Sequence, residues 1–392
     1  MTTTAHATGP AAEPDHLVEG EQRVTPIELF FDLVFVFGLT QVTAMLADDP
    51  TAGGLFRGLL VLLSLWWAWG GFAWLTNNAP PHGNRARLLI FGSMAAMLVA
   101  ALATPRAFGD DATTFAVAYA LVRLFHLGFY VTALPWEDGR RAVLRFTPTS
   151  LLGSALLVVA SLLERDAQMV VWCAALLVDI GGLYLSGTTG WHLEPGHFVE
   201  RYALIVIIAL GESIVALGVG AEGLDVDAGV IAAAVLGVAA SAAMWWCYFD
   251  VVAVVAERRL HALHGEARLR MARDSYSYLH FLMIAGVVLF ALGVKKTLGD
   301  VEKELGAVAA VGLCGGAGLY LLGHIAFRWR NLHTLNRQRL VAALACLAFI
   351  PAATAVPALA ALAVVAGLLV ALVSYEAIHF AEARARVRAG IG

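Results

Sequence analysis

Long runs of apolar residues, separated by short polar segments, recur along the chain from residue 27 to residue 380. Each run approaches the ~20 residues that a helix needs to cross the hydrocarbon core of a bilayer. About twelve spans are expected, near 27–46, 55–76, 88–104, 112–133, 148–163, 168–187, 201–220, 228–254, 275–294, 305–327, 339–356 and 358–380. The pattern predicts an all-α, polytopic membrane helix bundle. Because Pro357 alone separates the last two spans, a re-entrant hairpin there is the alternative to two full crossings.

Positive charge alternates from one end of the spans to the other. If the N-terminus is cytoplasmic, nineteen of the 26 Lys and Arg residues fall on the cytoplasmic side, six fall on the opposite side, and Arg123 lies in mid-span. Cytoplasmic loops of membrane proteins carry such an excess. The sequence therefore predicts that both termini are cytoplasmic.

Composition supports a membrane protein and limits its partners. Of 392 residues, 60% are hydrophobic and 14% are charged, against roughly half and a quarter in soluble domains. All four cysteines lie in apolar segments without paired spacing, so we expect neither a disulfide framework nor a cysteine metal site. The lipid bilayer is the expected partner, no nucleic-acid partner is expected, and the oligomeric state is not predicted.

The chain divides into four segments. Residues 1–26 are polar and acidic without a positively charged start, which predicts a disordered cytoplasmic tail rather than a cleaved signal. Residues 381–392 form a basic cytoplasmic tail. Between them we expect a first six-helix half over 27–187 and a second over 188–380.

Two features suggest that the halves are parallel repeats. The chain contains two tryptophan pairs, Trp66–Trp67 and Trp245–Trp246. The separation between these pairs is almost the same as the separation between Asp32 and Glu212. Six spans per half would keep the repeats parallel. Chance is the alternative, because tryptophan is favoured at membrane interfaces in any case.

Two carboxylates lie in the first span. In "IELFFDLVFVFGLTQVT", Glu28 and Asp32 are four residues apart and so share one face of a helix. An ionisable residue inside a membrane usually faces a partner or a wet cavity. The simpler interpretation is an acid pair that a neighbouring arginine neutralises to hold helices together.

The fourth span carries the single mid-span cation. In "AYALVRLFHLGFYV", Arg123 and His126 share a face. A buried guanidinium needs a carboxylate partner, since an unpaired charge in low dielectric is costly. The available partners are Asp32, Asp179 and Glu212, and the sequence does not choose among them.

The seventh span contains the strongest single-residue signal. In "HFVERYALIVIIALGESIVALG", Arg201 and Glu212 are three helical turns apart and share a face, and Glu200 precedes the arginine. Glu212 is placed mid-bilayer beside Ser213, whose small side chain allows another helix to approach closely.

Weaker candidates lie in later spans. They are Asp250, His324, Glu376 and His379. A Glu-x-x-His pair such as Glu376 and His379 binds metal where other helices supply matching ligands, but here the pair is isolated, so we expect structural pairing and no metal site. A histidine proton relay is an alternative to hydrogen-bonded core histidines, and we favour the latter.

Nucleotide and cofactor motifs are absent. The sequence contains no GxxxxGK[ST], no GxGxxG after a strand, no HExxH and no CxxC pair. We therefore expect no cofactor and no ATP-driven pumping by this chain alone.

Two quoted segments, "VTPIELFFDLVFVFGLTQVT" and "HFVERYALIVIIALGESIVALG", resemble the signature segments of the bacterial low temperature requirement A family. The matching positions are Glu28, Phe31, Asp32, Glu200, Arg201, Gly211, Glu212 and Ser213. The resemblance covers nearly the whole chain and implies a multi-pass protein of the bacterial inner membrane. It implies no established reaction.

Three functions are compatible with these patterns. The leading hypothesis is a transporter or channel-like protein for a small ion or molecule, whose intramembrane carboxylates line a shared pathway and whose Glu212 couples transport to protons. A membrane-embedded enzyme acting on a lipid or isoprenoid, with the same acids and histidines as acid/base groups, is the second and less favoured hypothesis. The third is a scaffold or sensor in which the polar residues fix helix packing.

Overall fold

The structure, a computed structural model, describes residues 23–389 except 80, 82 and 135. The predicted disorder of the N-terminal tail concerns residues 1–22, which lie outside the described residues, so it stays a prediction. Residues 390–392 of the predicted basic tail also lie outside them, whereas the rest of that tail forms a short helix.

The first group of helices comprises α1 (Pro26–Asp48), α2 (Ala52–Asn78), α3 (Gly83–Ala103), η1 (Thr104–Arg106), α4 (Ala112–Ala133), α5 (Glu137–Ala160) and α6 (Arg165–Ser186). The second group comprises α7 (Pro195–Gly220), α8 (Ala228–Phe249), α9 (Val252–Ala262), α10 (Gly265–Met271), η2 (Ala272–Leu279), α11 (His280–Gly299), α12 (Ala307–Ala310), η3 (Val311–Gly315), α13 (Gly316–Leu332), α14 (Arg337–Ala353), α15 (Ala358–His379) and α16 (Ala381–Arg388). The described residues form no strand, and the predicted all-α membrane bundle is confirmed.

Eleven helices in the described part of the chain are long and apolar enough to cross a membrane. The twelfth predicted span corresponds to α14, which has 17 residues and contains Pro351. Near one end of α14, the Arg339 side chain contacts Glu376, which lies near the end of α15. At its other end, the turn into α15 is tied to the loop after α11, because Ala358 N donates to Lys303 O. Helices α14 and α15 therefore run antiparallel between the two ends of the bundle, although α14 is the shorter and is not among the eleven membrane-length helices of the described residues, so the choice between a full crossing and a hairpin stays a prediction.

The helix bounds differ most from prediction at α5. The fifth span was expected to begin at residue 148, but α5 begins at Glu137 and continues through Pro148. Its first turns carry charged residues, so hydropathy could not place them in a span even though they are helical.

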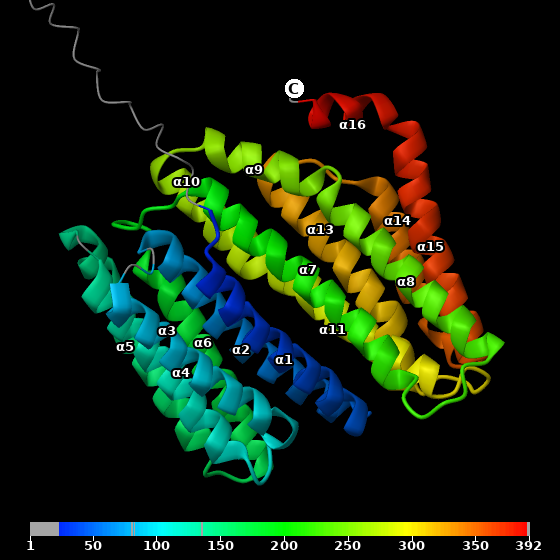
Figure 1. Cartoon of the computed structure of the whole chain (residues 1–392), viewed down its shortest axis with the longest axis horizontal. Helices are drawn as coiled ribbons and strands as arrows, with labels where there is room; N and C mark the ends of the chain where they lie inside the picture. Colours follow the sequence, from blue (N-terminus) through cyan, green and yellow to red (C-terminus); the bar gives the residue numbers. More distant parts are fainter. Residues whose placement is uncertain (1–22, 80, 82, 135, 390–392) are drawn as a thin grey trace, which may run out of the picture.

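The helices lie side by side along one common direction (Figure 1). Within the first group, α1 packs on α2 and α3, and α5 packs on α4 and α6. The two groups meet where α1 and α2 contact α7 and α11. Two of the polar groups discussed below, around Asp32 and around Glu212, lie along this junction.

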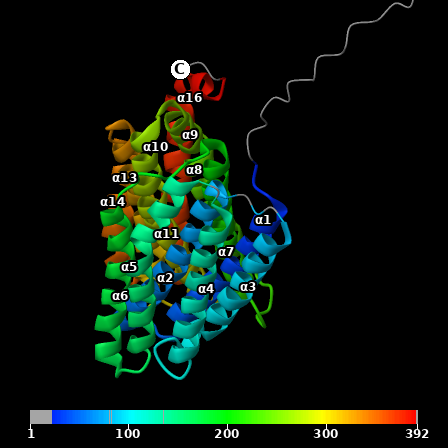
Figure 2. The same ribbon diagram turned by 90° about the vertical axis from the view of Figure 1, so that its left-hand side faces the viewer.

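One end of the bundle carries α9, α10 and α16, and we call it the arginine-rich end. Helix α16 turns away from α15 (Figure 1) and lies at this end of the bundle beside α9 and α10 (Figure 2). Side chains cap several helices where their first amide groups lack backbone partners. These caps are Thr51 for α2, Asp227 for α8 and Asn336 for α14.

Candidate functional site

A buried polar cluster joins α1 to α7 near the arginine-rich end. It consists of Glu28 and Asp32 on α1 and His197 and Arg201 on α7, and we call it the α1–α7 cluster. Each pair is four residues apart, so each lies on one face of its helix. Arg201 donates to both Asp32 oxygens at 2.9 Å, and His197 Nε2 lies 3.0 Å from Glu28 Oε1. The two signature segments of the sequence are therefore bound to each other.

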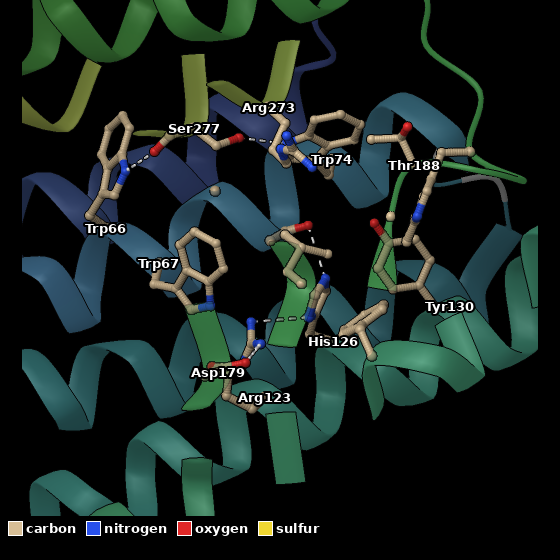
Figure 3. Close-up of a pocket in the computed structure, with 16 residues that line it drawn as sticks. Trp66, Trp67, Trp74, Arg123, His126, Tyr130, Asp179, Thr188, Arg273 and Ser277 are labelled. Carbon is tan, nitrogen blue, oxygen red and sulfur yellow. Dashed lines mark hydrogen bonds and ion pairs between the residues drawn. The ribbon is translucent and has the colours of Figure 1, made fainter. Parts of the chain in front are cut away.

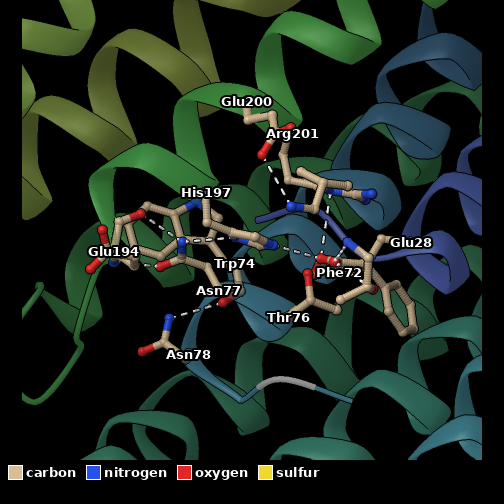
Figure 4. A network of polar contacts seen from close by, with 12 residues as sticks. Glu28, Phe72, Trp74, Thr76, Asn77, Asn78, Glu194, His197, Glu200 and Arg201 are labelled. Carbon is tan, nitrogen blue, oxygen red and sulfur yellow. Dashed lines mark hydrogen bonds and ion pairs between the residues drawn. The ribbon is translucent and has the colours of Figure 1, made fainter. Parts of the chain in front are cut away.

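Hydrogen bonds fix the tautomer of His197. Asn77 Nδ2 lies 3.1 Å from His197 Nδ1, and the Asn77 amide is oriented by bonds to the backbone of Glu194 (Figure 4). Because Asn77 Nδ2 is a donor, His197 Nδ1 accepts, and His197 Nε2 carries the proton that it donates to Glu28. The imidazole is therefore held between two partners, one on α2 and one on α1.

Asp32 and Arg201 are further supported by an indole ring. Trp69 Nε1 donates to Asp32 Oδ1 at 2.8 Å. The Arg201 guanidinium carbon lies 5.7 Å from the centroid of the Trp69 ring, within the range of a cation–π contact. Asp32 therefore accepts three hydrogen bonds from two helices, two of them in a bidentate contact with the guanidinium.

Burial limits what the α1–α7 cluster can do. Asp32 and His197 are wholly buried, and Glu28 and Arg201 are exposed by 2% or less. A substrate cannot reach these groups in this structure, which favours a role in joining helices. Glu200 lies apart from the cluster: it is exposed, and its carboxylate accepts from Val24 N at 3.0 Å.

Glu212 has a different environment from the other buried acids. Thr40 Oγ1 on α1 donates to Glu212 Oε2 at 2.6 Å. Among the described residues, no Lys, Arg or His nitrogen lies within 4.0 Å of its carboxylate. The neighbouring Ser213 bonds to Ser241 of α8 at 2.9 Å, so this part of α7 is bound on both sides by hydroxyl groups.

Asp32 and Glu212 both face the bundle interior but belong to separate polar groups. Asp32 is bonded to Arg201, whereas Glu212 is bonded to Thr40, eight residues further along α1. Eight residues correspond to ~12 Å along a helix. The single shared polar region that the sequence suggested is therefore divided in two.

The partner of Arg123 is Asp179. Arg123 Nη2 lies 2.8 Å from Asp179 Oδ1, which joins α4 to α6. Ser150 of α5 accepts from the same guanidinium at 2.7 Å and 3.1 Å. The three open alternatives are thereby reduced to one, and the contact holds three helices together.

His126 lies one turn from Arg123 and contacts α2. Its Nε2 lies 2.9 Å from the carbonyl oxygen of Gly71, so Nε2 carries a proton and donates it. A Cβ at position 71 would lie 2.8 Å from the imidazole ring, so only glycine allows this approach without a shift.

The Arg123–Asp179 pair lies in the wall of a cavity, which we call the aromatic cavity (Figure 3). Its volume is about 50 Å³, enough for a few water-sized groups. Its lining comes from α2, α4, α5, α6, the connection to α7, and η2. The lining residues are Trp66, Trp67, Gly70, Gly71, Trp74, Arg123, His126, Tyr130, Phe146, Asp179, Leu183, Gly187, Thr188, Trp191, Arg273 and Ser277.

A π-helical segment closes one side of the aromatic cavity. Within η2, Ser277 accepts from two indoles of α2: Trp66 Nε1 bonds to its carbonyl oxygen and Trp74 Nε1 to its hydroxyl, both at 2.8 Å. A π-helix leaves carbonyl groups without regular helical partners and often occurs at functional sites. The second group of helices thus contributes a wall to a cavity formed mainly by the first.

A third polar cluster lies in the second group at the arginine-rich end. Arg339 of α14 binds Glu376 of α15 through two bonds of 2.9 Å and 2.8 Å, and its Nη1 lies 3.2 Å from His324 Nδ1. Arg384 of α16 is paired with Asp250, the residue after α8. Three of the four weaker candidates, Asp250, His324 and Glu376, are therefore brought together.

His379, the fourth, lies apart. It is exposed, stacks on Tyr375 with ring centroids 3.9 Å apart, and takes no part in the Glu376 contacts. Among the described residues, no group of three or more His, Cys, Asp and Glu side chains is placed to hold a metal ion. Glu376 therefore joins helices through its ion pair with Arg339, and His379 does not act together with it.

Sequence analysis missed several residues of these clusters. His197 was the one with a usable signal, because His197 and Arg201 repeat the four-residue spacing of Glu28 and Asp32. Arg339 was not singled out, since it was only one of the nineteen positive residues assigned to the cytoplasmic side, but its side chain is buried. Ser277 carried no signal, since its importance depends on the π-helix.

Comparison with known proteins agrees with this architecture. The family model described as bacterial low temperature requirement A protein (LtrA) matches residues 23–374. The chain is also 29% identical over 309 residues to an uncharacterized protein of Rhizobium meliloti (strain 1021), an alignment that covers 76% of this chain and 75% of the relative. The many apolar helices indicate a multi-pass membrane protein, and the family points to the bacterial membrane. This chain belongs to the bacterial low temperature requirement A protein family.

Proposed function

We propose that this protein is a transporter of the bacterial cytoplasmic membrane, with both termini cytoplasmic, that carries a small solute through the aromatic cavity. One observation carries the proposal: a cavity between apolar, membrane-length helices, with an ion pair in its wall. Purely structural packing in a membrane has no need of such a space.

The lining of the aromatic cavity suits reversible binding of a small solute. Several indole and phenol rings supply apolar faces, while Arg123 and Asp179 supply charge. The buried Thr188 hydroxyl has no hydrogen-bond partner among the described residues. Buried polar atoms without partners are unfavourable, so a bound solute that pairs with them would be stabilised.

Glu212 is the proposed proton-exchanging group. The other buried acids of the spans cannot gain a proton without weakening an ion pair, as for Asp32 with Arg201 and Asp179 with Arg123. The Thr40 hydroxyl can donate to a carboxylate and can accept from a carboxylic acid. Glu212 can therefore change its protonation state while its hydrogen bond to Thr40 is kept.

Flux in proteoliposomes tests the proposal. Purified protein would be reconstituted with a pH-sensitive dye inside, and proton movement would be followed with a panel of cations and small organic solutes outside. We expect solute-driven proton movement in the wild type and its loss in Glu212→Gln, since the amide keeps the shape and the Thr40 bond. Glu222→Gln is the matched control, because Glu222 is an exposed glutamate just beyond α7. Failure of every solute to move protons, or unchanged proton coupling in Glu212→Gln, would refute the proposal.

A scaffold function is the second candidate. It is favoured by the ion pairs of Asp32, Asp179 and Glu376, each of which joins different helices. Under this function Glu212→Gln should alter thermal stability alone, and no solute should move in either protein.

A further inference from the structure

A second cavity, about 410 Å³ in volume, lies at the arginine-rich end between α9, α13, α14, α15 and α16. We call it the basic cavity, because Arg328, Arg339 and Arg384 line it with Glu376 as the acidic residue of the wall. It shares no lining residue with the aromatic cavity. No step of the proposed transport function uses it.

Two of the three arginines are engaged with carboxylates of the protein. Arg339 makes a two-bond contact with Glu376, and Arg384 Nε donates to Asp250. These contacts leave the wall with a net positive charge, because Arg328 has no carboxylate within 4.0 Å among the described residues. Its Nε donates instead to the neutral hydroxyl of Thr334 at 2.9 Å.

The wall also holds hydrogen-bond donors without acceptors. Arg384 Nη1 and Asn331 Nδ2 have no hydrogen-bond partner among the described residues, although Arg384 Nη1 lies 4.0 Å from Glu376 Oε2. Arg384 is 6% exposed and Asn331 is 7% exposed, so bulk water does not readily satisfy either donor. Asn331 is held in orientation because its Oδ1 accepts from Ser275 at 2.5 Å. Donors that are fixed, buried and unpaired favour a ligand that brings acceptors.

We propose that the basic cavity binds a phosphate-bearing anion, held by Arg328, Arg384 and Asn331. A phosphate group offers several acceptor oxygens, and planar guanidinium groups bind it through paired hydrogen bonds. It also balances the charge of Arg328, which is half-buried and has no carboxylate partner among the described residues.

The phosphate can come from a lipid headgroup or from a free phosphate. The other wall of the cavity is apolar and includes Val252, Phe327 and Phe380, which suits an acyl chain or glycerol moiety. The apolar wall favours an anionic phospholipid, and the experiment separates the two sources.

Thermal unfolding of the full-length, detergent-purified protein tests the inference. Its midpoint would be measured against increasing phosphatidylglycerol, phosphatidylcholine or inorganic phosphate. We expect phosphatidylglycerol to raise the midpoint with saturation and phosphatidylcholine to have little effect. If inorganic phosphate gives the same saturable rise, the ligand is free phosphate; if it gives none, the ligand is the lipid headgroup. No saturable effect of either anion would overturn the inference.

The variant Arg328→Gln tests the site itself. It removes a cation that takes part in no internal ion pair, so the protein should fold, and the apparent affinity for the anion should fall about tenfold. Arg337→Gln is the matched control, since Arg337 is exposed at the start of α14 and does not line the cavity. Equal loss of affinity in both variants would indicate non-specific attraction and would overturn the assignment.

Discussion

At the residue scale, the Arg123–Asp179 pair has the clearest energetic consequence. Both side chains are less than 5% exposed, and removing one partner leaves the other as an unpaired buried charge. We expect Arg123→Ala to lower the free energy of unfolding by about 3–5 kcal/mol, seen as a lower thermal midpoint and folded yield. The double variant Arg123→Leu, Asp179→Leu should recover part of this loss, because it removes both charges.

An exposed ion pair provides the control for that prediction. Arg106 pairs with Asp111 but is 68% exposed, so Arg106→Ala should change stability by no more than ~1 kcal/mol. If Arg123→Ala is as stable as Arg106→Ala, the Arg123 site is hydrated and the ion pair does not hold α4 to α6.

His197 gives the second prediction at this scale. His197→Leu removes the donor to Glu28 and the acceptor for Asn77 while keeping a similar volume. We expect a loss of about 1–3 kcal/mol, because Glu28 and Asn77 would remain buried with fewer partners. His197→Gln keeps a donor near Glu28 and should lose less. Equal midpoints for the two variants would mean that packing, rather than the hydrogen bonds, explains the effect.

The chemistry of individual residues was more predictable than their pairing. The four-residue spacing of Glu28 and Asp32 correctly placed both on one face, and the need of Arg123 for an acid was confirmed. The choice of Asp179 could not be predicted, because it depends on which helices are neighbours. Likewise, nothing in the local sequence separates the buried Arg339 from an arginine in a loop.

At the element scale, glycines determine how closely α11 and α13 approach. A Cβ at Gly286 would lie 2.6 Å from the backbone nitrogen of Tyr320, Gly316 lies at a similar contact between the same helices, and Gly293 lies at one between α11 and η3. Small residues allow such close packing of membrane helices. We expect Gly286→Ala to reduce stability by about 1–3 kcal/mol, measured by thermal unfolding.

Gly367 on α15 is the matched control, because no atom lies within 4 Å of a Cβ built there. Gly367→Ala should leave stability unchanged or slightly raised, since alanine favours helix more than glycine. A loss in Gly367→Ala as large as in Gly286→Ala would show that glycine flexibility, and not close packing, is what matters.

Hydropathy predicted which segments are long enough to cross the membrane, but not where the helices depart from regular α-helical geometry. The spans of α4 and α8 begin at the expected residues. The π-helices η2 and η3 were not predicted, because no side-chain pattern separates a π-turn from an α-turn. The aromatic cavity depends on η2, so the sequence pattern could not predict this cavity either.

At the scale of the whole molecule, the two groups of helices share an order of neighbours. In the first group α1 packs on α2 and α3, α3 on α4, α4 on α5, and α5 on α6. In the second, α7 packs on α8 and α11, α11 on α13, α13 on α14, and α14 on α15. Duplication of a six-helix unit would produce this order, and the two-half organisation stays a prediction.

The orientation of the bundle gives the last prediction. Positive residues gather at the arginine-rich end, and the positive-inside rule places that end in the cytoplasm. Single cysteines introduced at exposed positions of the full-length protein would report it, because the native cysteines Cys247, Cys314 and Cys346 are buried and Cys173 is half-buried. In intact spheroplasts, a membrane-impermeant maleimide should label Asp110→Cys and Glu302→Cys, which lie at the opposite end. It should label Arg141→Cys and Arg270→Cys only after lysis, with the wild type as background. Labelling of Arg270→Cys before lysis would reverse the orientation, and the basic cavity would then face the periplasm.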